Sequence, residues 1–332
     1  MADAVWFTGP RTAELKSEDI PDPGPGEVQV QAICGLVSAG SEMNLFRGEG
    51  NLPDFSAVPN VAGSLPFPVK FGYQEVGEIV AVGPGTTRAV GERVFCIHPH
   101  QSRFNLGEMW VSVIPPDLAP ERAVFAGMFW VGLNSCLTTP PLVGDCVVVS
   151  GLGVIGSMTA YLARLTAGKL ILVEPSAERR ARAGWIGADA VVAPSETANV
   201  VEELSRGRGA DLFIEASGAP PALQTALETT GNEGTISVSS WYGTRTVELS
   251  LSPEFHLRRH KVISTGPFVP PHLAPRWDMD RVREVSWQHL AQEDFPSALI
   301  SHRVPFADAP RAYQLVDDPA VETQAVLLEH AT

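Results

Sequence analysis

Apolar and polar positions follow two different patterns along the chain, and the change falls near residue 120. Before it, short stretches in which apolar residues tend to occupy every second position are separated by turns rich in Pro and Gly. This pattern predicts strands at residues 27–32, 75–82 and 92–97 in an irregular, barrel-like β domain. Residues 46–71 are rich in Pro and Gly over a long stretch, which indicates a loop.

After residue 120, apolar runs typical of buried strands alternate with stretches whose apolar residues recur at helical spacing. Six such runs with crossover helices match a doubly wound dinucleotide-binding sheet. The chain then adds a helix near residues 307–315 and a last strand at 324–328. The six strand candidates are residues 146–150, 170–174, 190–193, 212–216, 235–239 and 261–265.

A glycine-rich turn joins the first two of these strands through a helix. Gly151, Gly153 and Gly156 have the spacing GxGxxG, and Glu174 ends the second strand. In a dinucleotide site the first glycine permits a tight turn and the second lets the backbone approach a pyrophosphate. The third lets the helix pack close to the strand, and the acid accepts hydrogen bonds from the adenosine ribose. The combination predicts dinucleotide binding.

The bulk composition fits a globular protein that binds neither nucleic acid nor membranes. The 332 residues, 44% hydrophobic and 19% charged, allow two domains with sizeable cores. A net charge of −14 disfavours binding to nucleic acid or to an anionic membrane. The sequence has no apolar run of membrane-spanning length and no signal-peptide pattern at its start. The four cysteines are scattered, so we expect a cytoplasmic protein. The expected partner is a small-molecule substrate.

The order of these parts resembles the medium-chain dehydrogenase/reductase superfamily. The resemblance is carried by the passage VGEIVAVGPGTTRAVGERV, the GLGVIG turn and the EASG sequence at residues 215–218. It covers essentially the whole chain and implies an α/β fold with two domains. Residues 1–120 and 296–332 would form a GroES-like, β-barrel-type catalytic domain, and residues 121–295 a Rossmann domain with a doubly wound parallel sheet. The resemblance also implies an active site in the interdomain cleft and a homodimer formed through the strand at 261–265.

Within the superfamily, several passages are similar to the bacteriochlorophyllide a dehydrogenase-like branch. They are VSAGSEMNLFRG, GERVFCIHPHQSRF, SSWYG and FHLRRHKV, which begin at residues 37, 91, 239 and 255. This similarity does not fix the substrate, because such branches diversify.

The sequence departs from the superfamily at the positions that hold the catalytic zinc. Zinc alcohol dehydrogenases of the superfamily carry a Cys in a CGTD-like turn, a His in a GHExxG motif and a third Cys or Glu further on. Ala39 and Tyr73 stand at the first two positions, and the third falls near Phe129. Zinc is bound by thiolate, imidazole or carboxylate groups, which these residues do not supply. The four-cysteine structural zinc loop is also missing, so we expect no zinc and no other metal.

Without a metal, another group must polarise the substrate and exchange a proton with it. Tyr73 is the first candidate, because it replaces the zinc-binding His of the family. Ser41 stands where the family has a hydroxyl in its proton relay, and His98 is a third candidate because His titrates near neutral pH. Tyr73 is equally compatible with an aromatic that fills a vacated metal site, and His98 with a turn held by hydrogen bonds.

Further ligand contacts are expected at the carboxyl ends of the strands, where open α/β sheets bind their ligands. Bulky aromatic residues there indicate a bulky or hydrophobic substrate, although packing in the linking helix or between domains explains them as well. The expected pocket residues are Gln74, Phe129, Trp130, Trp241 and Tyr242. The expected cofactor-binding residues are Gly151, Gly153, Val154, Ile155, Gly156, Glu174, Arg179, Ser217 and Ser239.

Glu174 favours NAD(H), because a carboxylate repels the 2′-phosphate of NADP(H). Arg179 and Arg180 leave NADP(H) open, because arginines just past the second strand can hold that phosphate. The expected function is a zinc-independent, NAD(H)-dependent oxidoreductase acting on a carbonyl/alcohol or imine/amine pair in a bulky metabolite. Two alternatives remain. One is an NADPH-dependent reductase of an activated C=C bond, as in quinone and enoyl reductases, and the other is a non-catalytic dinucleotide-binding protein.

Overall fold

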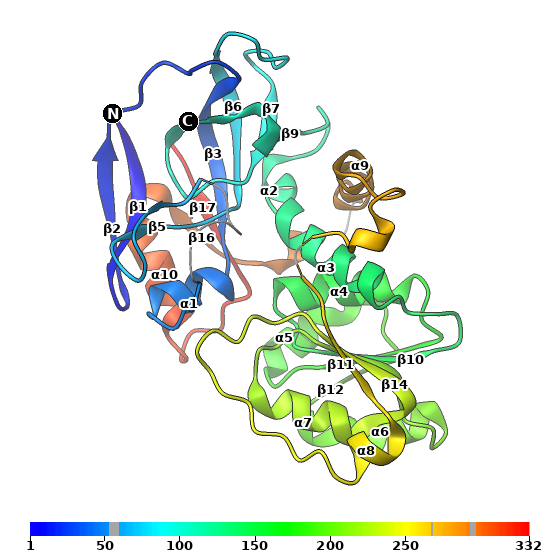
Figure 1. The fold of residues 1–332 in the computed structure, drawn as a ribbon. Coiled ribbons are helices and arrows are strands. Elements are labelled where there is room, and N and C mark those ends of the chain that lie inside the picture. The colour runs from blue at the N-terminus through cyan, green and yellow to red at the C-terminus, as the bar shows by residue number, and fades with distance from the viewer. Residues whose placement is uncertain (53–59, 267, 293–296, 332) are drawn as a thin grey trace. The chain divides into compact units, whose positions relative to one another are not determined.

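The structure is a computed structural model that describes residues 1–52, 60–266, 268–292 and 297–331 (Figure 1). The chain forms two compact units. The first unit comprises Met1–Gly127 and Arg283–Thr332, and the second comprises Met128–Val282. The two boundaries fall within helices α3 (Ala126–Thr138) and α9 (Met279–Leu290).

The first unit is built on two β-sheets. Its strands and remaining α-helices are β1 (Ala2–Gly9), β2 (Thr12–Glu18), β3 (Glu27–Val37), α1 (Ser41–Phe46), β4 (Ala62–Gly63), β5 (Val69–Lys70), β6 (Glu75–Val82), β7 (Arg93–Cys96), β8 (Arg103–Gly107), β9 (Val111–Val113), α2 (Pro120–Ala123), β16 (Ile300–Pro305), α10 (Ala309–Asp317) and β17 (Ala325–Glu329). The larger sheet has the order β16-β17-β3-β6-β7-β9 with β8 paired to β3, and the smaller has the order β2-β1-β5-β4.

Strand β3 organises the larger sheet, because it pairs antiparallel with β6, β8 and β17. Its first half alternates between half-buried and buried side chains. The buried members Val28, Val30 and Ala32 enter one core cluster with Ile79 and Phe104. The alternation that predicted a strand here is thus the alternation between the core and the other face of the sheet.

The three strands predicted in this region are confirmed as β3, β6 and β7. The hairpin of β1 and β2 was not predicted, because β2 is polar and largely exposed or half-buried and so lacks a clear apolar period. The prediction of a loop at residues 46–71 is wrong in part, because β4 and β5 lie within this stretch. Residues 53–59 of that stretch lie outside the described residues.

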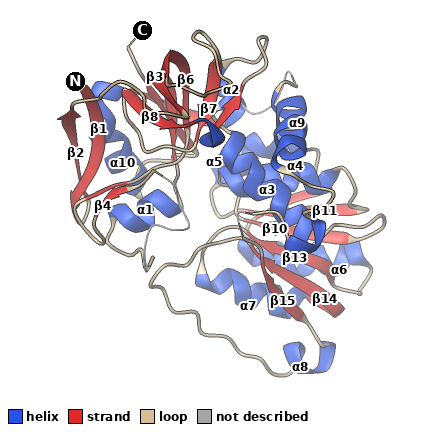
Figure 2. Ribbon diagram, turned by 45° about the horizontal axis from the view of Figure 1, so that its top comes forward, coloured by secondary structure: helices blue, strands red, loops and turns tan. Residues whose placement is uncertain are grey.

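The second unit is a six-stranded parallel sheet with helices on both faces. Its strands are β10 (Cys146–Ser150), β11 (Lys169–Val173), β12 (Ala190–Val192), β13 (Ala210–Glu215), β14 (Thr230–Val238) and β15 (Lys261–Ser264), in the order β12-β11-β10-β13-β14-β15. Its further helices are α4 (Val154–Arg164), α5 (Ala177–Arg182), α6 (Thr197–Ser205), α7 (Pro220–Thr229) and α8 (Glu254–Arg258). Figure 2 shows these strands side by side between helices.

The central strand β10 is buried on both sides, as its unbroken apolar run predicted. Val147 and Val149 pack in one cluster, which includes residues of α4. Cys146 and Val148 pack in a second cluster, which includes residues of α6 and α7. Helices therefore cover opposite faces of the sheet, and the carboxyl ends of the strands share one edge.

The predicted fold class, an α/β fold with a doubly wound parallel sheet and a separate β-barrel-type domain, is confirmed. All six predicted strands are present, and the predicted last helix and strand are α10 and β17. Strand β14 begins at Thr230 rather than at residue 235, and its pairing with β13 is irregular near that start. Among the described residues, no helix has the length and apolar character needed to cross a membrane.

Candidate functional site

The glycine turn between β10 and α4 has the geometry that a dinucleotide needs. Gly151 has a φ of +95°, and a Cβ atom there would lie 2.6 Å from Ser217 Cα. A Cβ atom on Gly156 would lie 1.8 Å from the Gly151 carbonyl oxygen, so a side chain would push the helix off the strand. A Cβ atom on Gly153 would meet nothing within 4 Å, which leaves this backbone open to a ligand. The three glycines thus fit the three requirements of the motif.

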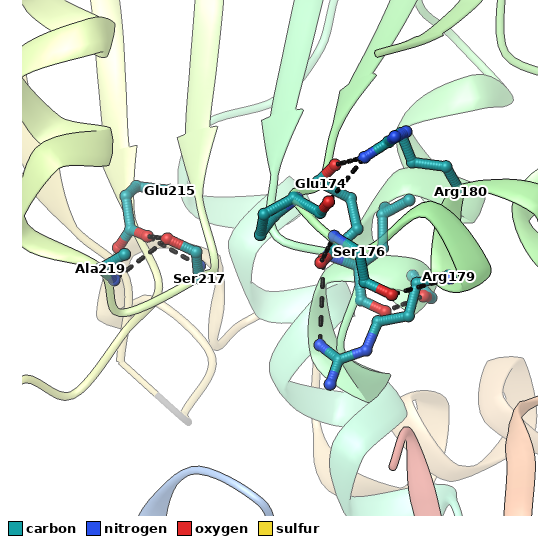
Figure 3. Close-up of polar contacts among 10 residues, drawn as sticks. Glu174, Ser176, Arg179, Arg180, Glu215, Ser217 and Ala219 are labelled. Carbon is teal, nitrogen blue, oxygen red and sulfur yellow. Dashed lines mark hydrogen bonds and ion pairs between the residues drawn. The ribbon is translucent and has the colours of Figure 1, made fainter. Parts of the chain in front are cut away.

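Glu174 follows β11 and is held against the glycine turn (Figure 3). Its Oε2 atom accepts a hydrogen bond from Leu152 N at 2.7 Å, and its Oε1 atom accepts one from Ser176 N at 3.0 Å. The side chain is 3% exposed. The carboxylate is therefore fixed beside the turn, with a defined position for a ribose diol to reach it.

Two arginines lie near Glu174 and are held differently (Figure 3). Arg180 Nη1 donates to the carbonyl oxygens of Glu174 and Pro175, both at 2.7 Å. Arg179 Nη1 lies 3.9 Å from Glu174 Oε2, and its backbone N donates to Ser176 Oγ at the start of α5. The Arg180 guanidinium is thus bound to the backbone, while that of Arg179 lies beside the carboxylate.

The turn after β13 packs against the glycine turn. Glu215 Oε1 accepts hydrogen bonds from Ser217 N at 2.7 Å, Ser217 Oγ at 2.5 Å and Gly218 N at 2.8 Å. Ser217 Oγ in turn accepts from Ala219 N at 3.1 Å, as Figure 3 shows. The structure therefore brings the predicted cofactor residue Ser217 directly to Gly151.

Hydroxyl groups gather where β14 and β15 end. Ser239 Oγ lies 2.7 Å from Ser135 Oγ of α3 and 2.9 Å from Thr265 Oγ1. Tyr242, which the sequence placed in a substrate pocket, donates its hydroxyl to Glu215 Oε2 at 2.8 Å. Ser135 and Thr265 were not predicted, although Thr265 directly follows β15 and could have been found by that rule.

In the first unit, Tyr73 lies among hydroxyl groups. Its hydroxyl donates to Ser38 Oγ at 2.6 Å, and the Ser41 side chain is also within hydrogen-bonding reach. Burial, aided by the charge of Glu42, raises the pKa of Tyr73 to about 12. The phenol is therefore protonated at neutral pH and is a hydrogen-bond donor. The structure places two of the candidate proton donors, Tyr73 and Ser41, close together, and it adds Ser38, which the sequence did not single out.

The neighbouring Gln74 is fully buried, and neither its Nε2 nor its Oε1 atom has a hydrogen-bond partner among the described residues. A Cβ atom on Gly127 would lie 2.2 Å from Gln74 Nε2, so the glycine makes room for the amide. Buried amides rarely lack partners, and such exceptions often mark ligand sites. Gln74 therefore stays a candidate for substrate contact.

His98 does not have the state expected of a general acid. Its ring stacks on Phe104 with centroids 3.9 Å apart, and its Nδ1 atom donates to the Pro99 carbonyl at 2.8 Å. Burial lowers the pKa of His98 to about 3. The neutral ring thus agrees with the alternative of a turn stabilised by hydrogen bonds.

His100 carries the charge instead, between two buried carboxylates. Its Nε2 atom lies 3.2 Å from Glu42 Oε2, and its Nδ1 atom lies 2.5 Å from Glu75 Oε1. Burial opposes the charged ring, but the two carboxylates outweigh it and raise the pKa of His100 to about 10. Glu42 also accepts from the Tyr313 hydroxyl at 2.8 Å, and Glu75 Oε2 lies 3.4 Å from His330 Nε2. The sequence gave no signal for this cluster, because its members lie far apart along the chain.

The remaining predicted residues lie in the second unit. Phe129 and Trp130 are buried residues of α3. Val154 and Ile155 are the first two residues of α4. Trp241 lies in the loop after β14 and is partly buried. Among the residues that the structure describes, no group of three or more His, Cys, Asp or Glu side chains is arranged to hold a metal ion.

Comparisons with known proteins agree with this geometry. The family model for zinc-binding dehydrogenase matches residues 154–270. The chain is 30% identical to (R,R)-butanediol dehydrogenase of Bacillus subtilis over 69% of this chain and 75% of that protein. It is 28% identical to D-guloside 3-dehydrogenase of Shigella flexneri over 93% of this chain and 95% of that protein.

Solved structures share the fold over nearly the whole chain. A protein of Sinorhizobium meliloti 1021 bound to NADP has a TM-score of 0.79 at 22% identity, covering 99% of both chains. An alcohol dehydrogenase of Escherichia coli CFT073 complexed with NADH has a TM-score of 0.79 at 21% identity, again covering 99% of both chains.

The state of His100 predicts a pH dependence of stability. Its folded pKa, about 10, exceeds its ordinary value of 6.5, so the folded state holds a proton that the unfolded state releases between these pH values. The stabilisation is complete below pH 6.5 and is lost as the pH rises to about 10. We expect the free energy of unfolding to fall by up to about 1.4 kcal/mol per pH unit in that window.

Urea unfolding at several pH values measures this slope. His100→Gln should lower stability at neutral pH and remove most of the slope, whereas His256→Gln, at an exposed position, should change neither. Comparison with the variant is needed because buried cysteines also protonate differently on unfolding above about pH 8.5. Parallel slopes for the wild type and His100→Gln would contradict the charged state of His100.

Proposed function

The chain belongs to the zinc-binding dehydrogenase family, and we propose that it transfers hydride between NAD(H) and a carbonyl/alcohol or imine/amine group without a catalytic zinc. That it is an NAD(P)-dependent oxidoreductase follows from its family and its named relatives. The observation that carries the finer proposal is the Tyr73 hydroxyl, hydrogen-bonded to Ser38 at 2.6 Å at a position where family members have a zinc-binding His.

The residues at the zinc positions do not fit the metal. Ala39 has no ligand atom, and the third position falls in an apolar stretch around Phe129. The nearby carboxylates of Glu42 and Glu75 already bind the charged ring of His100. A cation placed beside them would compete with that imidazolium and be repelled by it. This residue set supports a reaction without zinc.

In this proposal, Tyr73 handles the proton at the substrate oxygen or nitrogen. When bound, the nicotinamide supplies or accepts the hydride. Because Tyr73 is protonated at neutral pH, it can donate a hydrogen bond to a carbonyl oxygen that replaces Ser38 as its acceptor. Ser38 and Ser41 lie where they can exchange a proton with the phenol.

Glu174 supports NAD(H) as the cofactor. Its carboxylate is fixed beside the glycine turn by two backbone N–H groups, so it cannot easily turn away from a 2′-phosphate. Arg180 is bound to backbone carbonyls, which leaves Arg179 as the arginine nearest to the carboxylate. The related folds occur with NADP and with NADH, so the preference has to rest on these residues.

The names of the relatives favour an alcohol as the reduced substrate. Relatives act on D-guloside and (R,R)-butanediol, as their names state. We propose a carbonyl/alcohol pair ahead of an imine/amine pair on this ground. A bulky metabolite is supported by the aromatic residues Phe129, Trp130 and Trp241, which we propose as pocket residues of the second unit. Gln74 of the first unit is proposed separately as a substrate contact.

Two other functions stay open. NADPH-dependent reduction of an activated C=C bond is favoured by Arg179, which lies 3.9 Å from Glu174 and could hold a 2′-phosphate. A non-catalytic dinucleotide-binding protein would keep the glycine turn and need no proton donor. Activity of the pure protein against ketones, imines and enones separates these functions.

We also propose a homodimer formed through β15. This strand ends the sheet order and has an unpaired edge within the described chain. Val262 on it is 50% exposed. Pairing with a second copy would satisfy the edge and cover this apolar side chain.

The proposed function predicts a preference for NADH in a protein that contains no metal. Nicotinamide fluorescence titrations of metal-analysed protein should show tight NADH binding, at least about tenfold weaker NADPH binding and no zinc. Preference for NADPH would favour the C=C reductase. Zinc at one equivalent per chain would contradict the metal-free proposal and return the chain to metal-dependent alcohol dehydrogenases.

A further prediction concerns Tyr73. Tyr73→Phe should lower kcat with the best screened ketone or alcohol by roughly 100-fold or more, because a general acid contributes that much. Its Kd for NADH should stay unchanged. Tyr161→Phe is the matched control, since Tyr161 lies on α4 and packs against Trp185. If the Tyr73→Phe variant kept the full kcat, Tyr73 would not be the proton donor and would serve only as a packed aromatic side chain.

Another prediction concerns the oligomeric state. Sedimentation of the wild type should give the mass of two chains, and Val262→Lys should shift it toward one chain because lysine opposes edge pairing. Val143→Lys is a control at a 93% exposed position outside the sheet. A monomeric wild type at micromolar concentration would rule out this interface.

A further inference from the structure

The loop after β14 is attached to the turn after β13 by two adjacent side chains. The Tyr242 hydroxyl donates to Glu215 Oε2 at 2.8 Å, and Arg245 Nη1 donates to the Gly218 carbonyl at 2.9 Å. Arg245 Nε also donates to the Tyr242 carbonyl at 3.0 Å, and its guanidinium carbon lies 5.8 Å from the centre of the Tyr242 ring. Loop and turn are thus joined by several polar contacts.

Glu215 divides its carboxylate between the turn and the loop. Its Oε1 atom accepts hydrogen bonds from Ser217 N, Ser217 Oγ and Gly218 N, and so holds the turn. Its Oε2 atom accepts the bond from Tyr242. Because Glu215 is 0% exposed, a carboxylate oxygen that lost its donor would carry a large desolvation cost. Removing the Tyr242 hydroxyl therefore favours a shift of Glu215 and of the turn that it holds.

The turn after β13 also limits the position of the glycine turn. A Cβ atom on Gly151 would lie 2.6 Å from Ser217 Cα and 2.7 Å from Ser217 N, so the two backbones are in direct contact. Strand β13 lies beside β10 on the side opposite to β11. Ser217 and Glu174 therefore approach the glycine turn from its two sides, Ser217 after β13 and Glu174 after β11.

We propose that Tyr242 is a positioning residue for the dinucleotide, acting through Glu215 on the Ser217 side of the glycine turn. This inference rests on the proposed binding of NAD(H). A residue outside the GxGxxG motif thus contributes to cofactor affinity. The proposal also gives a function to the hydrogen bond that Tyr242 donates to the buried carboxylate of Glu215. In this proposal the adenosine binds on the Glu174 side of the site. Loss of the Tyr242 hydroxyl therefore weakens the binding of the rest of the dinucleotide and not that of the adenosine.

Two ligands separate these halves. AMP contains only the adenosine and one phosphate, whereas NADH extends past the glycine turn. Fluorescence titration gives the Kd of NADH, or of NADPH if the wild type binds it more tightly, and displacement by AMP gives the Kd of AMP. In Tyr242→Phe the dinucleotide Kd should rise roughly three- to tenfold, because one hydrogen bond to a charged group is lost and its effect is partly relayed. The AMP Kd should stay within twofold of the wild-type value.

Arg245→Gln is a second variant at an exposed position and should show the same split, because it loses the Gly218 contact. Tyr161→Phe should change neither constant. Equal weakening of AMP and dinucleotide in Tyr242→Phe would show general loosening of the unit and overturn the proposal, as would an unchanged dinucleotide Kd. A wild type that binds neither NADH nor NADPH would overturn the proposed function itself, so the two failures are distinguishable.

Discussion

The missing side chain at Gly151 is the constraint on which the nucleotide side of the molecule depends. It lets the turn after β13 lie in backbone contact with the turn after β10, at a distance that no other residue would permit. Glu174 holds the same turn from the β11 side through Leu152 N. Three neighbouring strands of one parallel sheet thus define the position of a short glycine-rich segment, and this is the preorganisation that phosphate binding requires.

In the first unit, a buried charge cluster has a comparable function for the candidate proton donor. Buried charges stabilise a fold only when they are paired, and His100 pairs with carboxylates from α1 and β6. Glu42 also accepts from Ser38 N at 3.1 Å, and Ser38 accepts from the Tyr73 hydroxyl. The imidazolium is therefore connected to the phenol through two residues. The buried imidazole and the candidate proton donor therefore belong to one connected set of polar contacts.

The sequence predicted local features well because each follows from a single stretch of chain. These features are the unbroken apolar run of β10, the glycine spacing and the acid at residue 174. Each of them depends on residues that lie close together in the sequence. The polar strand β2 escaped prediction because its side chains are exposed or half-buried and show no apolar period. Its place in the fold is set by pairing with β1, which only the structure shows.

The polar contacts of the sites were much less predictable. His98 and His100 are two residues apart, yet one stacks on Phe104 as a neutral ring and the other is charged between Glu42 and Glu75. The sequence does not separate the two histidines, because the partners that decide protonation come from distant segments. The contact of Tyr242 with Glu215 was missed for the same reason, although the rule that ligands bind at strand ends had drawn attention to both segments.

The attachment of Tyr242 to Glu215 has a consequence for how such an enzyme can change. Trp241, a candidate for substrate contact, is the immediate neighbour of Tyr242, whose hydroxyl binds the carboxylate of Glu215 that holds the turn at Ser217. A mutation that remodels this loop for a new substrate therefore risks disturbing the cofactor turn at the same time. Divergence of substrate range is easier where the two tasks lie on separate loops. Directed evolution of this chain would therefore progress further by varying the proposed pocket residues Phe129 and Trp130 of α3 while keeping residues 242 and 245 fixed.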